Sequence, residues 1–293
     1  MTGMRRHTLL RTLLGCSPFP WSWREKRPPA STHHRWVWSA LLACGWLVAS
    51  MGWASEDDRF TVEPDRPDIS NSTHTVPVHM LQVELGLEYA RFHDDTSERR
   101  LAAQTTLRMG LTDRLEVRLD GEPLVRVQED SDDVGLGDLA LGVKARVFEP
   151  VEGQCWPALG IQPFIKIPTA RTPIGSGRLD AGALLLADQD LPWEMQLTVN
   201  AGLVVLGQSH GALLQGLAAA SLSREFSDRL SPYLELFFAS REERDGHDTV
   251  GLDVDAFYRV TRRIAVDAAT EMTLNRRRPD YALRTGVSWL VGR

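Results

Sequence analysis

Much of this chain alternates between apolar and polar residues with a period of two. Residues 81–89 read LQVELGLEY, in which every second residue is apolar. A period of two sends neighbouring side chains to opposite faces of a β-strand, so each such stretch predicts a strand with one apolar and one polar face. We predict about twelve such strands, at 81–92, 101–109, 115–120, 139–147, 158–167, 179–189, 193–205, 215–226, 230–240, 249–259, 263–274 and 281–291.

The connections between these stretches also alternate. Short connections fall at 111–114, 190–192, 227–228 and 261–262, and longer, more charged ones at 93–99, 128–134, 169–177, 241–248 and 275–279. Tilted strands of roughly 9–11 residues cross an outer membrane, with short turns on the periplasmic side and longer loops outside. The pattern therefore predicts an all-β fold, a transmembrane antiparallel up-and-down β-barrel of about twelve strands over residues 79–293.

Periodicity alone does not say which face points inward, because soluble sandwiches and barrels alternate too. Charge favours the membrane barrel, since apolar stripes in every strand would expose a large patch on a soluble monomer. The polar face then lines the lumen, and its acids outnumber its bases, which predicts a pore that prefers cations or neutral solutes. The predicted lining residues are Glu84, Glu88, Glu116, Arg118, Asp120, Lys144, Lys166, Glu235, Asp253, Asp255, Asp267, Glu271 and Arg284.

The first 54 residues have a different character. They contain seven of the 33 Lys and Arg residues and one acid, and residues 37–54 form an uncharged run ending GWA. A basic segment, an apolar run and small residues at a cleavage site are typical of a secretory signal. A lipoprotein site at LLAC (41–44) and a single membrane helix stay open as alternatives. Residues 55–78, rich in Asp, Pro and Ser, are predicted to be an irregular periplasmic segment that partly plugs the pore.

Export leaves an acidic chain. Without residues 1–54, 26 bases face 38 acids, a net charge of −12. This balance argues against a nucleic-acid partner. We expect the bacterial outer membrane as the location, and lipid, lipopolysaccharide, the barrel assembly machinery and a small-molecule solute as partners.

Several segments carry a family resemblance. DRPDIS (65–70), LQVE (81–84), RMGLTDRLEVR (108–118), GLGDLALGVK (135–144) and FSDRL (226–230) occur in this order. Together they resemble the outer-membrane family known as the meta-pathway of phenol degradation family, a group of proposed transporters. The resemblance covers essentially all of the chain after the signal. It implies an outer-membrane barrel that passes small, often aromatic or apolar, molecules, without enzymatic activity, and assigns no catalytic or ligand residue.

Two other functions stay open. GQSHG (207–211) fits G-x-S-x-G, and with a strand before it and a helix over 212–223 it would place Ser209 on a nucleophile elbow. A hydrolase would then need an acid such as Asp228 or Glu235, and His247; an esterase barrel would also use Ser209. The other alternative is a sealed barrel with a structural role.

No cofactor or metal is expected. Asp130, Asp132 and Asp133 lack the glycine and spacing of a calcium loop and are interpreted as a solvated acidic loop. Arg276, Arg277 and Arg278, in a predicted outer loop, are candidates for pairing with lipopolysaccharide phosphates.

Overall fold

The computed structural model describes residues 60–66, 69–93, 97–129, 131–151, 155–172, 174–275 and 281–292. The predicted signal segment 1–54, Asp130 and the three arginines at 276–278 lie outside the described residues. The described residues form no helix that is long and apolar enough to cross a bilayer.

Twelve long strands of 10 to 16 residues and one short strand form the sheet. They are β1 (Leu81–His93), β2 (Ser97–Thr112), β3 (Leu115–Gln128), β4 (Asp132–Gly135), β5 (Leu139–Phe148), β6 (Ala158–Ile167), β7 (Asp180–Leu191), β8 (Met195–Gly207), β9 (Ala212–Arg224), β10 (Leu230–Ala239), β11 (Thr249–Thr261), β12 (Ile264–Thr273) and β13 (Tyr281–Val291).

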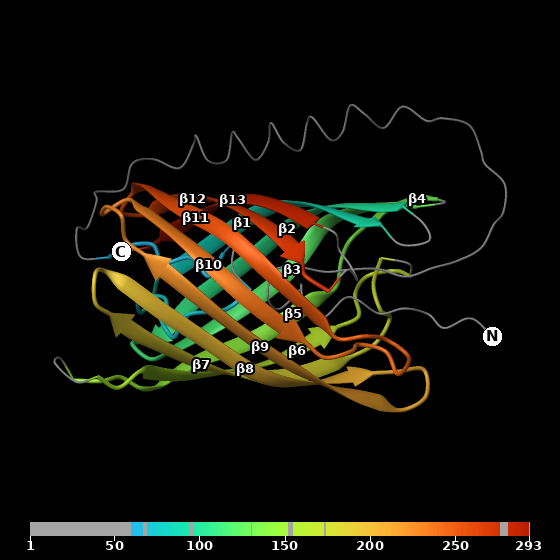
Figure 1. Ribbon diagram of the computed structural model, residues 1–293, viewed down its shortest axis with the longest axis horizontal. Helices are drawn as coiled ribbons and strands as arrows, with labels where there is room; N and C mark the ends of the chain where they lie inside the picture. Colours follow the sequence, from blue (N-terminus) through green and yellow to red (C-terminus); the bar gives the residue numbers. More distant parts are fainter. Residues whose placement is uncertain are drawn as a thin grey trace. The chain divides into compact units, whose positions relative to one another are not determined.

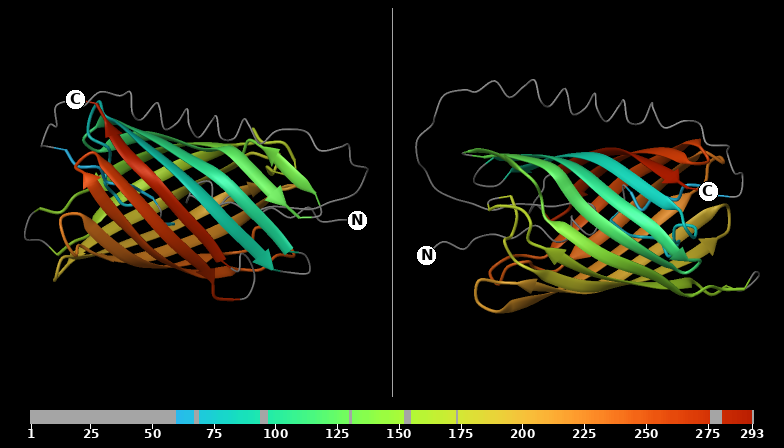
Figure 2. Two further views of the ribbon diagram at one scale, coloured as in Figure 1. Left: turned by 90° about the horizontal axis from the view of Figure 1, so that it is seen from above. Right: turned by 180° about the vertical axis from the view of Figure 1, so that it is seen from behind.

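The sheet closes on itself. Each long strand pairs antiparallel with the next one along the chain, and β1 pairs with β13 from Leu81↔Val291 to Arg91↔Tyr281. Figure 1 shows the strands running obliquely around the barrel, and Figure 2 shows the same wall from above and from behind. Closure gives every backbone group of the wall a strand neighbour, which lipid cannot supply. The predicted twelve-strand up-and-down barrel is confirmed.

On the side away from β2, β3 pairs with two successive strands, β4 and β5, instead of one unbroken strand, which the sequence did not indicate. β4 pairs with the outer part of β3, from Val125↔Gly135 to Gln128↔Asp132, inside the stretch predicted to be a loop. β5 then pairs with β3 from Asp120↔Ala140 onward. At the break, the backbone N–H of Gly137 donates to the carbonyl oxygen of Glu122 (2.8 Å). The Asp138 carboxylate accepts backbone N–H bonds from the β6–β7 loop, so that this loop is fixed on the break.

The two ends of the barrel differ. The tight turns after β2, β7, β9 and β11 share one end with the C-terminus, and we call it the periplasmic end. The longer β5–β6 connection at this end departs from the predicted rule of short turns. Trp193, Phe226 and Tyr258 lie exposed beside these turns, where amphipathic rings suit a membrane interface.

Both prolines predicted inside strands are accommodated. Pro163 pairs with Ala183 of β7 and has no partner on β5, where the register is interrupted between Gly142↔Phe164 and Ala145↔Ile161. Pro232 lies one residue before the β9 pairing begins at Tyr233. Each missing N–H therefore falls where one neighbouring ladder is absent.

Candidate functional site

The barrel wall has an outer face with exposed apolar side chains and an inner face whose side chains are mostly buried. Along β10 the burial alternates strictly, with Glu235 fully buried and its neighbours Leu234 and Leu236 half exposed. In a barrel one layer thick, a buried wall side chain is one that points into the lumen. The exposed large apolar residues recur on the other face of the strands, which is the belt expected to meet lipid.

All thirteen side chains predicted to line a pore lie on the inward face. None is more than 5% exposed. They come from β1, β3, β5, β6, β10, β11, β12 and β13. Burial to this degree means that other groups fill the space between them, so their role as the lining of an open passage stays a proposal.

A segment before β1 fills much of that space. We call residues 60–80 the strap; all but 67 and 68 are described. Near its start, Val62 N–H donates to Arg262 O (2.7 Å) in the periplasmic β11–β12 turn, and near its end Val78 bridges to Gly110 of β2. Between these points the strap forms hydrogen bonds with side chains of seven strands, β1, β2, β3, β5, β7, β8 and β10. The sequence prediction of an irregular periplasmic segment over 55–78 that partly plugs the pore concerns this stretch and stays a prediction.

Asp65 is the electrostatic centre of the strap. Its Oδ2 lies 2.7 Å from Lys144 Nζ, 3.0 Å from Arg118 Nη1 and 3.4 Å from Arg108 Nη1. Burial alone would raise the pKa of Asp65, but the three cations outweigh that effect and hold the pKa well below its ordinary value. The charged carboxylate therefore ties the strap to three different strands.

The Arg66 guanidinium lies against two glycines. Gly86 of β1 and Gly286 of β13 are cross-strand partners, and a Cβ on Gly86 would overlap the Arg66 guanidinium. Nη1 of Arg66 donates to Gln104 Oε1 (2.7 Å). Glycine is required at this place because any larger side chain would fill the seat of Arg66.

Glu235 binds the middle of the strap. Its carboxylate accepts the backbone N–H bonds of Ile69 and Ser70, both at 3.0 Å, and the Ser70 hydroxyl at 2.5 Å. Bonds of this kind to a charged acceptor are roughly twice as strong as neutral ones.

Three further strap amides bond to wall side chains. Asn71 N–H donates to Asn200 Oδ1 (2.7 Å), and Thr73 N–H and Oγ1 donate to Asp188 Oδ2 (2.6 and 2.7 Å). Val76 N–H donates to Glu116 Oε2 (2.8 Å). Since the strap lacks regular structure, these wall oxygens replace the backbone partners that its amides would otherwise need.

Arginines organise the charged part of the wall. Arg108 binds Glu116 (2.9 Å) and Glu84 (3.0 Å), and Arg100 binds Glu88 (2.9 Å). Neither arginine was among the predicted lining residues, although both lie on the polar side of the alternation in β2. That alternation is weak, because Ala103 and Thr105 interrupt its apolar face.

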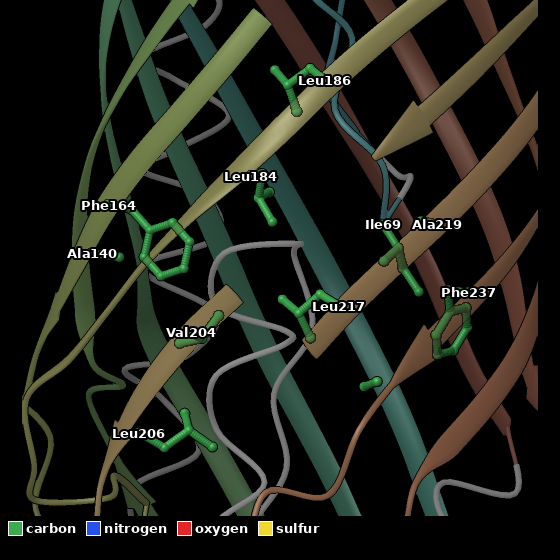
Figure 3. Packing of buried hydrophobic residues seen from close by; sticks show 11 residues of the cluster. Ile69, Ala140, Phe164, Leu184, Leu186, Val204, Leu206, Leu217, Ala219 and Phe237 are labelled. Atoms are coloured by element: carbon green, nitrogen blue, oxygen red, sulfur yellow. The ribbon is translucent and has the colours of Figure 1, made fainter. Parts of the chain in front are cut away.

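The rest of the wall corrects the prediction of a charged lumen. Inward side chains of β5 to β10 form an apolar cluster that Ile69 of the strap joins (Figure 3). We call this cluster the apolar wall; it consists of Ile69, Ala140, Phe164, Leu184, Leu186, Val204, Leu206, Leu217, Ala219, Phe237 and Ala239. Strands such as β7, whose centre reads LLL (184–186), carry apolar residues on both faces.

The β6–β7 loop lies at the outer end of the lumen, and its contacts there are apolar too. Ala170 and Ile174 pack on Ala102, Val125 and Val127 at the inner faces of β2 and β3. The loop is held by Asp138, which accepts the N–H bonds of Ala170 (2.9 Å) and Ser176 (3.3 Å).

The α/β-hydrolase hypothesis is wrong, because the described residues form an all-β barrel. Ser209 lies in the exposed β8–β9 turn, and residues 212–223, predicted to be a helix, belong to strand β9. Asp228 is in a periplasmic turn at the other end of the barrel, and Glu235 is buried against the strap. The strand–turn–helix context that strains and exposes a nucleophile is therefore missing around this serine.

Nothing in the described part of the chain gathers three or more His, Cys, Asp or Glu side chains fit for a metal ion. Asp132 instead forms a paired contact with Arg126 (2.7 and 2.8 Å), and Asp133 accepts from Ser131 Oγ (2.6 Å). The hydrogen bond from Arg126 lowers the pKa of Asp132.

The sequence was compared with known families and structures. Residues 64–291 match the profile of the family described as "Putative MetA-pathway of phenol degradation". The chain belongs to this family. No curated protein sequence matches the chain closely enough to serve as a relative.

Solved structures share the fold at low sequence identity. The COG4313 outer membrane channel from Pseudomonas putida F1 is 15% identical, with a TM-score of 0.61 over 78% of this chain and 100% of that chain. The NanC porin is 11% identical, with a TM-score of 0.47 over 71% of this chain and 98% of that one. At 15% identity the likeness to the COG4313 channel shows the fold, which is that of an outer-membrane β-barrel.

Proposed function

We propose that this member of the family is an outer-membrane transport channel for small, largely apolar molecules. The observation that carries the proposal is the apolar wall, which faces the lumen although lumen-facing positions of such barrels are ordinarily polar. Burying a ring such as that of Phe164 away from water stabilises apolar contacts by about 1.5–3 kcal/mol per side chain. A wall of this kind would give an apolar solute contacts inside the barrel.

The family description and the shared fold of the COG4313 outer membrane channel support the same class of function. Non-enzymatic passage is part of this proposal. The apolar outer belt supports outer-membrane lipid as the surrounding medium, with lipopolysaccharide and the assembly machinery as further partners. Export by residues 1–54 stays part of this proposal.

Uptake of a neutral aromatic probe tests the channel. Intact cells that produce the protein would be given N-phenyl-naphthylamine, which fluoresces when it enters membranes. Production of the wild type should speed entry, and Phe164→Gln should reduce it because a polar amide interrupts the apolar wall. Arg126→Gln, at the exposed end of β3, is the matched control and should behave as wild type. Equal rates for Phe164→Gln and wild type, with both folded, would refute the proposal.

A sealed barrel is the second candidate, and the strap is the observation that favours it. Planar-bilayer conductance separates the two, since a sealed barrel passes no current. If current flows, the acid excess on the inward face predicts a reversal potential that shows cation preference. Anion preference would contradict the lining assignment of residues such as Glu84 and Asp253.

A further inference from the structure

The wall from β10 to β13 carries more negative charge than its neighbours can balance. Five inward carboxylates lie there: Glu235, Asp253, Asp255, Asp267 and Glu271. Arg284 is the fully buried arginine of the same strands, whereas Arg259 of β11 pairs with Glu225 (3.5 Å) and Arg66 of the strap lies 3.8 Å from Asp267. Arg284 already has three carboxylate partners. It pairs with Glu271, with Asp253 (3.2 Å) and with Glu88 of β1 (3.3 Å).

Asp255 is the carboxylate left over. It is 4% exposed, and neither of its oxygens accepts a hydrogen bond from any described residue. Its neighbour Glu235 is occupied by the strap amides. A buried carboxylate without a partner is costly, which marks a group that a ligand would satisfy.

Two aromatic residues and a serine occupy neighbouring register positions on β10 and β11. Tyr233 of β10 is the direct cross-strand partner of Asp255, and Phe257 follows two residues later on the same face. Their ring centroids are 6.5 Å apart with planes tilted by 52°. Ser231, the cross-strand partner of Phe257, is 3% exposed, and its Oγ has no hydrogen-bond partner among the described residues.

We propose that Asp255, Tyr233, Phe257 and Ser231 form a subsite for the positively charged nitrogen of a small organic solute. An ammonium group carries only N–H donors, so it would satisfy the Asp255 oxygens and could donate to the Ser231 hydroxyl. The Tyr233 ring would attract the cation, and the Phe257 ring, which already has the Arg259 guanidinium 5.0 Å from its centroid, would cover the apolar part of such a solute. The inference rests on the proposed function, since the solute must enter the lumen.

The chemistry of the subsite favours an organic ammonium over a divalent metal ion and over an anionic solute. A divalent metal would need several ligands, and the described residues hold no group of three suited to one. An anionic solute would meet Asp253, Asp255 and Asp267 together and be repelled. An alkyl or arylalkyl ammonium uses both features, the unpaired charge and the rings.

Binding to the purified full chain in detergent tests the subsite. Phenethylammonium and the neutral alcohol phenylpropanol would be titrated calorimetrically into wild type and Asp255→Asn at mildly alkaline pH. The wild type should bind the ammonium at least about tenfold more tightly than the alcohol. Asp255→Asn should lose about that factor for the ammonium and none for the alcohol. Asp132→Asn, in which an exposed paired carboxylate is changed, is the matched control.

Folding does not confound this variant. Neutralising an unpaired buried charge removes a desolvation penalty, so Asp255→Asn should keep the mobility shift on boiling of a closed barrel. Three results would overturn the subsite: equal ammonium affinity of wild type and Asp255→Asn, no ammonium binding by wild type, or full competition by KCl at equal concentration. These results are independent of the cell-uptake test, so the channel proposal and the ammonium subsite can fail separately.

Discussion

Replacing Asp65 with asparagine removes the charge that ties the strap to the barrel wall. The Asp65 carboxylate meets three buried cations within 3.4 Å, and asparagine keeps its shape but offers them no charge. Breaking a buried ion pair costs about 3–5 kcal/mol. Arg108 and Arg118 keep other carboxylate partners in Glu116 and Asp120. We therefore expect strap binding to weaken by about 2–3 kcal/mol.

Hydrogen exchange followed by mass spectrometry measures this loss directly. The strap amides of residues 69–76 are protected only while they bond to the wall, so their exchange should accelerate about 30- to 150-fold. Peptides from the barrel strands should be unchanged. Asp132→Asn makes the same substitution in a pair that is about half exposed, where such pairs contribute about 0–1 kcal/mol. Unchanged strap exchange in Asp65→Asn, or an equal rise in the strands, would refute the assignment.

The same carboxylate predicts a pH dependence. Because the pKa of Asp65 is lowered when the strap is bound, its contribution is complete above the ordinary carboxyl value of about 4 and is lost as the pH falls through the lowered value. Strap exchange in the wild type, corrected for intrinsic rates, should therefore rise below about pH 4. Asp65→Asn should lack this rise, and a matching rise in the variant would assign it to another group.

Other substitutions probe the strap and the lipid face. Glu235→Gln should raise strap exchange about tenfold, because a neutral amide replaces the charged acceptor of three donors; no change would contradict that role. Gly86→Ala should displace Arg66 from its seat and raise single-channel conductance, whereas Gly216→Ala meets only ordinary contact and should leave conductance unaltered. Leu185→Arg places a charge on a side chain 63% exposed to lipid. It should destabilise the barrel by about 2–4 kcal/mol in a urea titration read by mobility on unboiled gels, and an unshifted midpoint would argue against a membrane-facing position.

The strands could be predicted because alternation is a local property. The stretch LQVELGLEY fixes which residues of β1 share a face, and lipid outside requires the apolar set to be the outer one. The break between β4 and β5 could not be predicted in this way. It depends on Asp138 meeting a loop some thirty residues later, which no local pattern records.

The apolar wall of the lumen was not predicted, for a related reason. Alternation identifies an inward face only where that face is polar, so Phe164, Leu184 and Leu206, whose neighbours are apolar too, give no sign of pointing inward. Asp65 and Arg66 carry no periodic signal at all. Their partners are brought near by barrel closure, as with Ser70 and Glu235, which are 165 residues apart in the chain.

The path of the strap determines how it can leave. Val62, near its start, contacts the periplasmic β11–β12 turn, and Val78, near its end, contacts Gly110 close to the periplasmic end of β2. Only the middle, at Ile69 and Ser70, reaches the centre of β10. The segment is thus a loop that enters and leaves the barrel through the same, periplasmic, end. It can be withdrawn without parting any two strands and without threading a chain end through the wall. Release would therefore leave the strand pairing intact, and a force applied from the periplasmic side alone would be enough to achieve it.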